Sequence, residues 1–141
     1  MSAQPGSTAA GVRFSIPVRV YYQDTDAGGV VFHAQYLAFM ERARSEFLNA
    51  RGIDLATWSE THGVLIVVHA LTARYLRPAR LNEMLTVTAE VAHIGRAGLG
   101  YAQRVERAGE LLVDARIDLA IVNRATMKPS RLPDDLKRIL G

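Results

Sequence analysis

Cysteine is absent from the 141 residues of this sequence. Disulfide bonds, thiolate nucleophiles, and zinc or iron–sulfur sites held by cysteine are therefore excluded. The sequence also lacks an apolar run long enough to span a bilayer. Hydrophobic residues make up 49% of the chain and charged residues 22%, which is typical of a globular protein. Any chemistry must come from carboxylates, hydroxyls, imidazoles or backbone dipoles.

Lysine is scarce. Of the 17 basic residues only Lys128 and Lys137 are lysine, which leaves 15 arginines. The planar arginine side chain suits phosphate and carboxylate groups, so a phosphate-bearing ligand is one interpretation and ordinary surface charge is the other. The net charge is only +3 and the cations are scattered along the chain. This pattern does not favour nucleic acid as a partner.

The first twelve residues carry no charged side chain and are rich in serine, alanine and glycine. This composition predicts a flexible tail over residues 1–12, followed by one folded domain over residues 13–141. The tail lacks the basic start and the continuous apolar stretch of a secretory signal. A cytoplasmic location without a membrane span is therefore expected.

Hydrophobic periodicity predicts one long helix in a chain that is otherwise mostly strands. Residues 13–22 read as a first strand, in which Pro17 indicates an edge or a bulge. Residues 31–51 change to helical spacing. Their predicted apolar face consists of Tyr36, Leu37, Phe39, Met40, Ala43, Phe47 and Leu48. Arg44 interrupts this face and needs either a partner or a route to solvent.

The same spacing predicts two ion pairs on the helix, Glu41 with Arg44 and Arg42 with Glu46. Asp54 is expected to cap a short second helix. The rest is predicted to form a short terminal helix and four antiparallel strands, at residues 64–75, 84–94, 99–107 and 111–123. One long helix covers a five-stranded sheet poorly, so we expect an α+β protein that forms at least a dimer.

The densest group of chemically active side chains lies between the first strand and the long helix, in the segment YQDTDAGGVVFH. The helix start offers unpaired backbone N–H groups, which can bind an anion or a developing oxyanion. Gly28 and Gly29 allow a close approach of backbone to ligand. Asp24 or Asp26 can act on a carbonyl held there, or either can be a capping or turn residue. The histidines lack metal-ligand spacing, and no metal site is predicted.

A resemblance to a known family is carried by the stretch VRVYYQDTDAGGVVFHAQYLAFMERARSEFL. It resembles the opening of the tol-pal-associated acyl-CoA thioesterases, in the 4-hydroxybenzoyl-CoA thioesterase branch of the hot-dog superfamily. The resemblance extends through ARYLRPARLNEMLTV, IGRAGLGYAQRV and KPSRLP. It implies a five-stranded antiparallel sheet wrapped around one long central helix, assembled as a dimer or tetramer. It also implies hydrolysis of acyl-CoA, or of an acyl carrier protein thioester, with no separate cofactor because coenzyme A belongs to the substrate.

The resemblance also implies roles for individual residues. Asp26 takes the position of the carboxylate that attacks the thioester or activates water, and His33 and Tyr22 take positions associated with the site. A backbone N–H near His33 is expected to polarise the thioester carbonyl. Three residues of the turn are expected to hold the substrate: Gly28, Gly29 and Val30. Its phosphates are expected to meet arginines, first Arg96 and then Arg77 and Arg80.

Departures from the family pattern leave alternatives open. Gln35 stands where asparagine is usual, and Phe32 where tyrosine is common. Some hot-dog thioesterases place the carboxylate on the central helix, which makes Glu41 a second candidate, although its ion pair with Arg44 is the preferred interpretation. Two other functions are a non-catalytic thioester-binding or scaffold module and a hydroxyacyl-thioester dehydratase. The dehydratase is disfavoured because no proline-rich loop follows His33.

Overall fold

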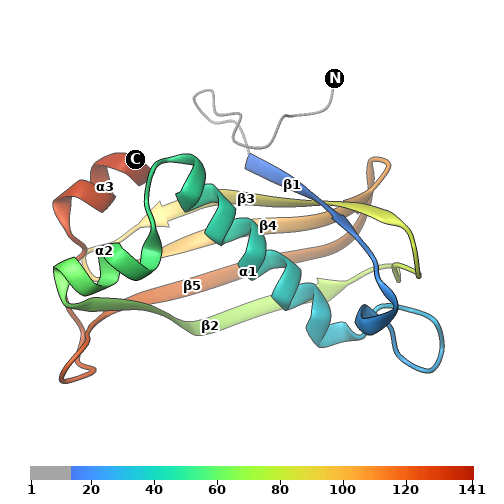
Figure 1. Ribbon diagram of the computed structural model, residues 1–141, viewed down its shortest axis with the longest axis horizontal. Coiled ribbons are helices and arrows are strands. Elements are labelled where there is room, and N and C mark those ends of the chain that lie inside the picture. The colour runs from blue at the N-terminus through green and yellow to red at the C-terminus, as the bar shows by residue number, and fades with distance from the viewer. Residues whose placement is uncertain (1–13) are drawn as a thin grey trace.

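The computed structural model describes residues 14–141, and the tail predicted at residues 1–12 lies outside them. The described elements follow in this order: β1 (Phe14–Arg19), a 3-10 turn (Tyr22–Asp24), α1 (His33–Ala50), α2 (Leu55–His62), β2 (Val64–Tyr75), β3 (Met84–Ile94), β4 (Gly98–Arg107), β5 (Glu110–Asn123) and α3 (Asp134–Leu140). The five strands form one antiparallel sheet that wraps around α1 (Figure 1). The predicted α+β hot-dog fold is confirmed.

The strand order across the sheet is β1-β3-β4-β5-β2. The two glycine turns join β3 to β4 and β4 to β5 as antiparallel neighbours, as predicted. β2 does not lie beside β3, which follows it in sequence. It pairs instead with β5, from Val64 opposite Asn123 to Tyr75 opposite Val113. β1 and β2 are thus the two edges of the sheet, and an edge strand is where Pro17 is tolerated.

Helix α1 buries the face that its spacing predicts. Leu37 is half-buried, and six residues are buried: Tyr36, Phe39, Met40, Ala43, Phe47 and Leu48. The chain leaves the helix at Gly52, whose φ of +80° is a left-handed conformation that favours glycine. Asp54 then caps α2 by accepting a hydrogen bond from the Ala56 N–H at 3.2 Å. No helix within residues 14–141 is long and apolar enough to cross a membrane.

A polar cluster joins α1 to the sheet inside this core. Arg44 reaches inward and donates from Nη1 to Oε1 of Gln103 at 2.8 Å. The Gln103 amide donates in turn to the backbone carbonyls of Met40 and Thr88, at 3.0 and 2.9 Å. Gln103 is fully buried. It is the partner that Arg44 requires on an otherwise apolar face.

Neither ion pair predicted on α1 forms a salt bridge in the described part of the chain. Glu41 accepts a hydrogen bond from the Ser45 hydroxyl at 2.9 Å. The guanidinium of Arg42 lies 5.8 Å from the centre of the Phe39 ring. The prediction was wrong because Arg44 turns inward to Gln103 of β4, which helical spacing does not reveal. Glu41 and Arg42 contact other neighbours on the same helix instead.

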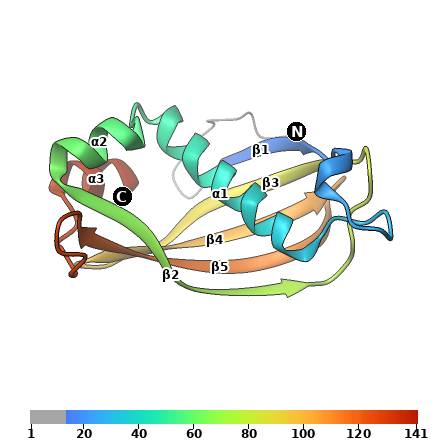
Figure 2. The same ribbon diagram turned by 60° about the horizontal axis from the view of Figure 1, so that its bottom comes forward.

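The edge formed by β2 is poorly covered. It exposes three large apolar side chains by 43 to 46%, those of Val68, Leu71 and Tyr75. Figure 2 shows α1 lying across β1, β3 and β4, with β2 at the far edge of the sheet. A bulge between Val68 and Ala70 interrupts the register with β5. An apolar edge therefore remains, as expected when one helix covers five strands.

Candidate functional site

The segment with two aspartates forms a tight loop between the 3-10 turn and the start of α1, at one end of the molecule (Figure 1). The Asp26 N–H donates to the Val30 carbonyl at 2.9 Å, and the Gly29 N–H donates to the Asp26 carbonyl at 3.0 Å. Gly29 has a φ of +78°, which favours glycine. The sequence DAGGV thus closes on itself directly before the helix.

The stretch between β2 and β3 holds this loop against the core. The Val31 N–H donates to the Ala79 carbonyl at 2.9 Å, and Val30 forms an isolated β-bridge with Arg80. The Ala79 N–H donates to the hydroxyl oxygen of buried Tyr36 on α1 at 2.8 Å. Burial raises the pKa of Tyr36, outweighing the opposite effect of the Ala79 hydrogen bond. The hydroxyl therefore stays protonated and keeps the loop in place.

The two aspartates have different surroundings. Asp24 is only 4% exposed, and its carboxylate accepts from the Tyr21 N–H at 2.8 Å and from the Gln35 amide at 3.0 Å. Asp26 is exposed, and its Oδ1 accepts from the Gly28 N–H at 2.8 Å. Its Oδ2 has no hydrogen-bond partner within residues 14–141. Of the two carboxylates, that of Asp26 is the one available to a ligand.

The start of α1 offers two free donors beside this loop. The Gln35 N–H is already bonded to the Phe32 carbonyl at 2.8 Å, whereas the N–H groups of His33 and Ala34 donate to no other group of the described chain. They belong to the first turn of an 18-residue helix, where the positive end of the helix dipole lies. This position stabilises an oxygen that acquires negative charge.

Aromatic side chains surround the helix start. The Tyr75 hydroxyl, at the end of β2, donates to the His33 carbonyl at 3.1 Å. The ring centres of Phe32 and His33 lie 4.4 Å apart, and both side chains are exposed. Tyr22 is 82% exposed. Sequence reasoning missed Tyr75, because it lies 42 positions from His33 and only the strand crossover brings it near.

The arginines predicted to bind phosphate do not gather at this loop. Arg96 lies in the turn after β3, at the opposite end of the sheet (Figure 1). The eleven residues of β3 separate the two ends by roughly 35 Å. Arg77 forms a salt bridge with Glu110 at 3.0 Å, while Arg80 lies beside Val30. Within one chain the structure brings together these predicted residues: Asp26, Gly28, Gly29, Val30, His33 and, through its bridge with Val30, Arg80.

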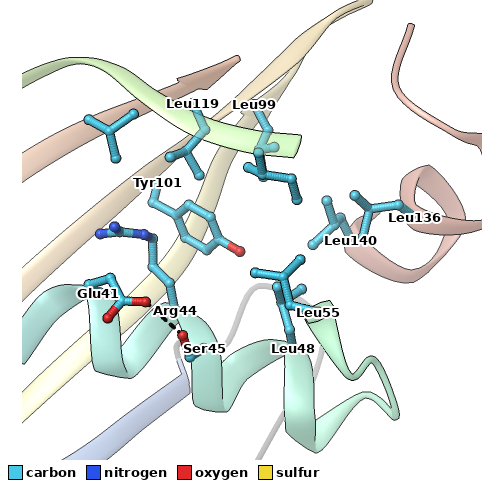
Figure 3. Close-up of a pocket in the computed structure, with 12 residues that line it drawn as sticks. Glu41, Arg44, Ser45, Leu48, Leu55, Leu99, Tyr101, Leu119, Leu136 and Leu140 are labelled. Atoms are coloured by element: carbon cyan, nitrogen blue, oxygen red, sulfur yellow. Dashed lines mark hydrogen bonds between the residues drawn. The ribbon is translucent and has the colours of Figure 1, made fainter. Parts of the chain in front are cut away.

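A pocket of about 160 Å³ lies away from this loop, between the second half of α1, α2, α3 and the sheet (Figure 3). Its wall is apolar and contains Leu48, Leu55, Ile66, Val68, Leu99, Leu119, Leu136 and Leu140. Its polar members are Glu41, Arg44, Ser45 and Tyr101. Glu41, the second candidate carboxylate, therefore belongs to this pocket and not to the Asp26 loop. Residues 14–141 contain no group of three or more side chains placed to hold a metal ion.

An antiparallel sheet wrapped around one long helix, with a free carboxylate and free N–H groups at the helix start, defines a hot-dog protein with a site suited to acyl transfer. The thioesterase superfamily model matches residues 28–113. Acyl-CoA thioesterase YbgC from Haemophilus influenzae is 42% identical over 124 residues, which cover 88% of this chain and 91% of that protein. The chain belongs to the thioesterase superfamily.

Two further proteins illustrate the similarity. Acyl-CoA thioester hydrolase YbgC from Escherichia coli O6:H1 is 41% identical over 124 residues, covering 87% of this chain and 92% of that protein. The crystal structure of a probable thioesterase from Bartonella henselae superposes with a TM-score of 0.82 at 34% identity, covering 86% of this chain and 100% of that one. Both sequence and fold therefore agree with the family assignment over most of the chain.

Proposed function

We propose that this protein is an acyl-CoA thioesterase that hydrolyses its substrate at the Asp26 loop. Membership of the thioesterase superfamily and the similarity to YbgC proteins support the reaction. The observation that carries the site is the exposed Asp26 carboxylate beside the free N–H groups of His33 and Ala34. The reaction consumes acyl-CoA and water and releases a carboxylic acid and the coenzyme A thiol. It needs no separate cofactor, and the proposed location is the cytoplasm.

The proposed mechanism places the thioester oxygen at the start of α1. The N–H groups of His33 and Ala34 donate to it and stabilise the negative charge of the transition state. Asp26 then acts in one of two ways. Its carboxylate attacks the carbonyl carbon and expels the thiolate, and water hydrolyses the mixed anhydride, or it takes a proton from a water molecule that attacks directly. The Gly28 N–H orients Oδ1 and leaves Oδ2 for this step.

The surroundings of Asp26 have supporting roles in this proposal. Gly28 keeps the space beside the carboxylate open, because a Cβ there would lie 3.3 Å from Asp26 Oδ1, and Gly29 allows the turn through its φ of +78°. Val30 forms the base of the turn, and the side chains of His33 and Tyr22 line its rim. The acyl donor is either coenzyme A or an acyl carrier protein, since both present a thioester on the same kind of flexible arm. Acyl-CoA and acyl carrier protein substrates compared in one assay distinguish the two.

Asp26→Asn is expected to lower kcat by roughly a hundredfold to ten-thousandfold while leaving Tm nearly unchanged. The amide neither attacks the carbonyl nor takes a proton, but it keeps the shape and the acceptor for Gly28. Thiol release from short-chain, long-chain and aromatic acyl-CoAs measures the effect. Retained turnover in this variant would rule out the assignment.

Asp24→Asn is the matched control, because its side chain is the other carboxylate of the same loop. Rotation of the Gln35 amide allows a hydrogen bond with the new Asn side chain, so we expect a loss of activity below about tenfold. A larger loss for Asp24→Asn than for Asp26→Asn would show that the wrong aspartate has been chosen. Melting curves of both variants separate a folding defect from a catalytic one.

We also propose that two copies pair through β2. The strand is twelve residues long and hydrogen-bonded on one side only, and it exposes Val68, Leu71 and Tyr75. An antiparallel two-fold pairing sets the Tyr75 end of one strand against the Val64 end of the other. The turn that carries Arg96 lies at the Val64 end of the sheet. Such a pair would bring Arg96 of one copy toward the site of the other, where it would meet the phosphates at the far end of the coenzyme A arm.

Mixed dimers test this arrangement. Arg96→Ala is expected to raise KM for acyl-CoA by roughly tenfold, and Asp26→Asn removes kcat. In a mixture of the two variants, each heterodimer holds one site in which both residues are intact, so activity recovers above that of either homodimer. Arg77→Ala is the control, since Arg77 already pairs with Glu110. Absence of recovery would refute the shared site and leave the role of Asp26 untouched.

A further inference from the structure

The pocket at the second half of α1 has the size and lining of a small-molecule site. Its volume is about 160 Å³, and an apolar cavity of about 150 Å³ is large enough to bind benzene. Leucine side chains from α1, α2, α3, β4 and β5 form its wall (Figure 3). The pocket therefore accommodates one aromatic ring or a short alkyl chain.

The Tyr101 hydroxyl points into this pocket, as Figure 3 shows. The tyrosine is only 2% exposed, and its ring packs edge-on against Phe47 at 5.6 Å. The hydroxyl has no hydrogen-bond partner within residues 14–141. Burial raises the pKa of Tyr101 well above its ordinary value of 10.0, against the opposite effects of Arg44 and Arg51, so the group is a neutral O–H. Because this hydroxyl faces the pocket and makes no hydrogen bond to the described chain, it is free to bond with a ligand there.

The other polar groups at the edge of the pocket already have partners. Arg44 donates to Gln103 at 2.8 Å, and Ser45 donates to Glu41 at 2.9 Å. Tyr101 is therefore the polar side chain of this wall that makes no hydrogen bond within residues 14–141. A ligand whose apolar part fills the pocket and whose oxygen lies near the Tyr101 hydroxyl would match both the apolar wall and this polar group.

We propose that this pocket binds the far end of the acyl group and that Tyr101 selects acyl groups carrying an oxygen there. A hydroxylated ring or a short hydroxylated chain has this chemistry, and a plain alkyl chain does not. The inference rests on the proposed thioesterase function. Ile66 and Val68 of the pocket lie on β2 toward its Val64 end. In the two-fold pair this end faces the partner's catalytic loop, and the acyl group would enter from that side.

Binding of two ring compounds tests the pocket without any turnover. We expect the affinity of p-cresol relative to toluene, measured by calorimetry, to be roughly tenfold higher in the wild type than in Tyr101→Phe. Comparing this affinity ratio between the wild type and Tyr101→Phe cancels the difference in hydration between p-cresol and toluene. Tyr101→Phe should be about as stable as the wild type without ligand, because the hydroxyl makes no hydrogen bond to the described chain. An unchanged ratio, or a clear loss of stability, would overturn the inference.

Leu140→Trp serves as the blocking control. Leu140 is half-buried on α3 and lines the pocket, so the larger side chain fills the space while its outer edge remains in solvent. This variant is expected to lose at least tenfold in affinity for both probes, with little change in the Tm of the free protein. Unchanged affinity in Leu140→Trp would place the probes elsewhere and refute the pocket as their site.

Kinetics then connect the pocket to the substrate. The wild type is expected to prefer aromatic acyl-CoAs with a ring hydroxyl over the same compounds without it, by roughly tenfold in kcat/KM. Tyr101→Phe should abolish this preference, whereas Asp26→Asn should lower turnover of both compounds equally and leave p-cresol binding intact. Absence of turnover with every thioester would refute the thioesterase function. Turnover with a preference unchanged in Tyr101→Phe would refute the role of Tyr101 alone.

Discussion

Gln103→Leu is predicted to lower the free energy of unfolding by more than the loss of one hydrogen bond would. The Gln103 amide makes three hydrogen bonds that connect α1 to the sheet: it accepts from Arg44 and donates to the carbonyls of Met40 and Thr88. Leucine keeps a similar volume and removes all three bonds. The Arg44 guanidinium then loses its amide partner in surroundings whose burial already lowers its pKa, against the opposite effect of Glu41.

The magnitude follows from these contacts. A hydrogen bond to a charged group contributes about 1.5–3 kcal/mol, and a neutral one about 1 kcal/mol. The Met40 carbonyl lies within α1 and keeps its helical bond, so its contribution is small. The bonds to Arg44 and Thr88 together give about 3 kcal/mol. In a domain of this size, that loss lowers Tm by roughly 10 °C.

Urea unfolding and thermal melting measure this loss. In the double variant Arg44→Met with Gln103→Leu, no charged group is left without its partner. We therefore expect the double variant to be more stable than the sum of the two single effects predicts. A loss below about 1 kcal/mol for Gln103→Leu, or a double variant less stable than that sum, would refute the reasoning.

Two further predictions concern acid stability and a close backbone contact. Burial raises the pKa of Glu83, but its hydrogen bonds and the charge of Arg107 lower it more, to below 4.5. The ionised Glu83 carboxylate therefore stabilises the fold above pH 4.5, and this stabilisation disappears as the pH falls and the carboxylate is protonated. The Tm difference between wild type and Glu83→Gln should shrink as the pH falls below 4.5, and a constant difference would contradict this. Gly98→Ala should cost about 2 kcal/mol or more in urea unfolding, because its Cβ would lie 2.5 Å from the Leu119 carbonyl oxygen. In the control Gly95→Ala the nearest atom is at 3.4 Å, and an equal loss there would exclude this cause.

The secondary structure is largely predictable because local spacing determines it. The predicted strands at residues 64–75 and 84–94 have the observed bounds, and the buried face of α1 is the predicted one. The strand order is not predictable in the same way. β2 crosses to the far side of β5, and local periodicity contains no information about which strand becomes its neighbour. The same limitation explains why the predicted ion pair of Glu41 with Arg44 does not form, because Gln103, the partner of Arg44, comes from a distant strand.

The candidate site is likewise predictable from the sequence only in part. Asp26, Gly28, Gly29, Val30 and His33 are close in sequence, so the loop that joins them is predictable. Asp24 and Asp26 differ in their burial. The residue types around them in the sequence do not show which of the two aspartates is buried. The contacts of Tyr75 and Tyr101 depend on residues from other elements. Arg96 was expected near the phosphates, and the length of β3 shows that a single chain does not bring it to Asp26.

The position of helix α3 has a consequence for how the substrate preference of this protein can change. Its Leu136 and Leu140 form part of the pocket wall, while Asp135 holds the helix to α2 through the indole of Trp58 and the ring of His62, both at 3.2 Å. None of these residues belongs to the loop that carries Asp26. The pocket proposed to bind the acyl group and the loop proposed to cleave it are thus separate in sequence. On this proposal, substitutions within the seven residues of α3 change substrate preference and leave hydrolysis itself intact.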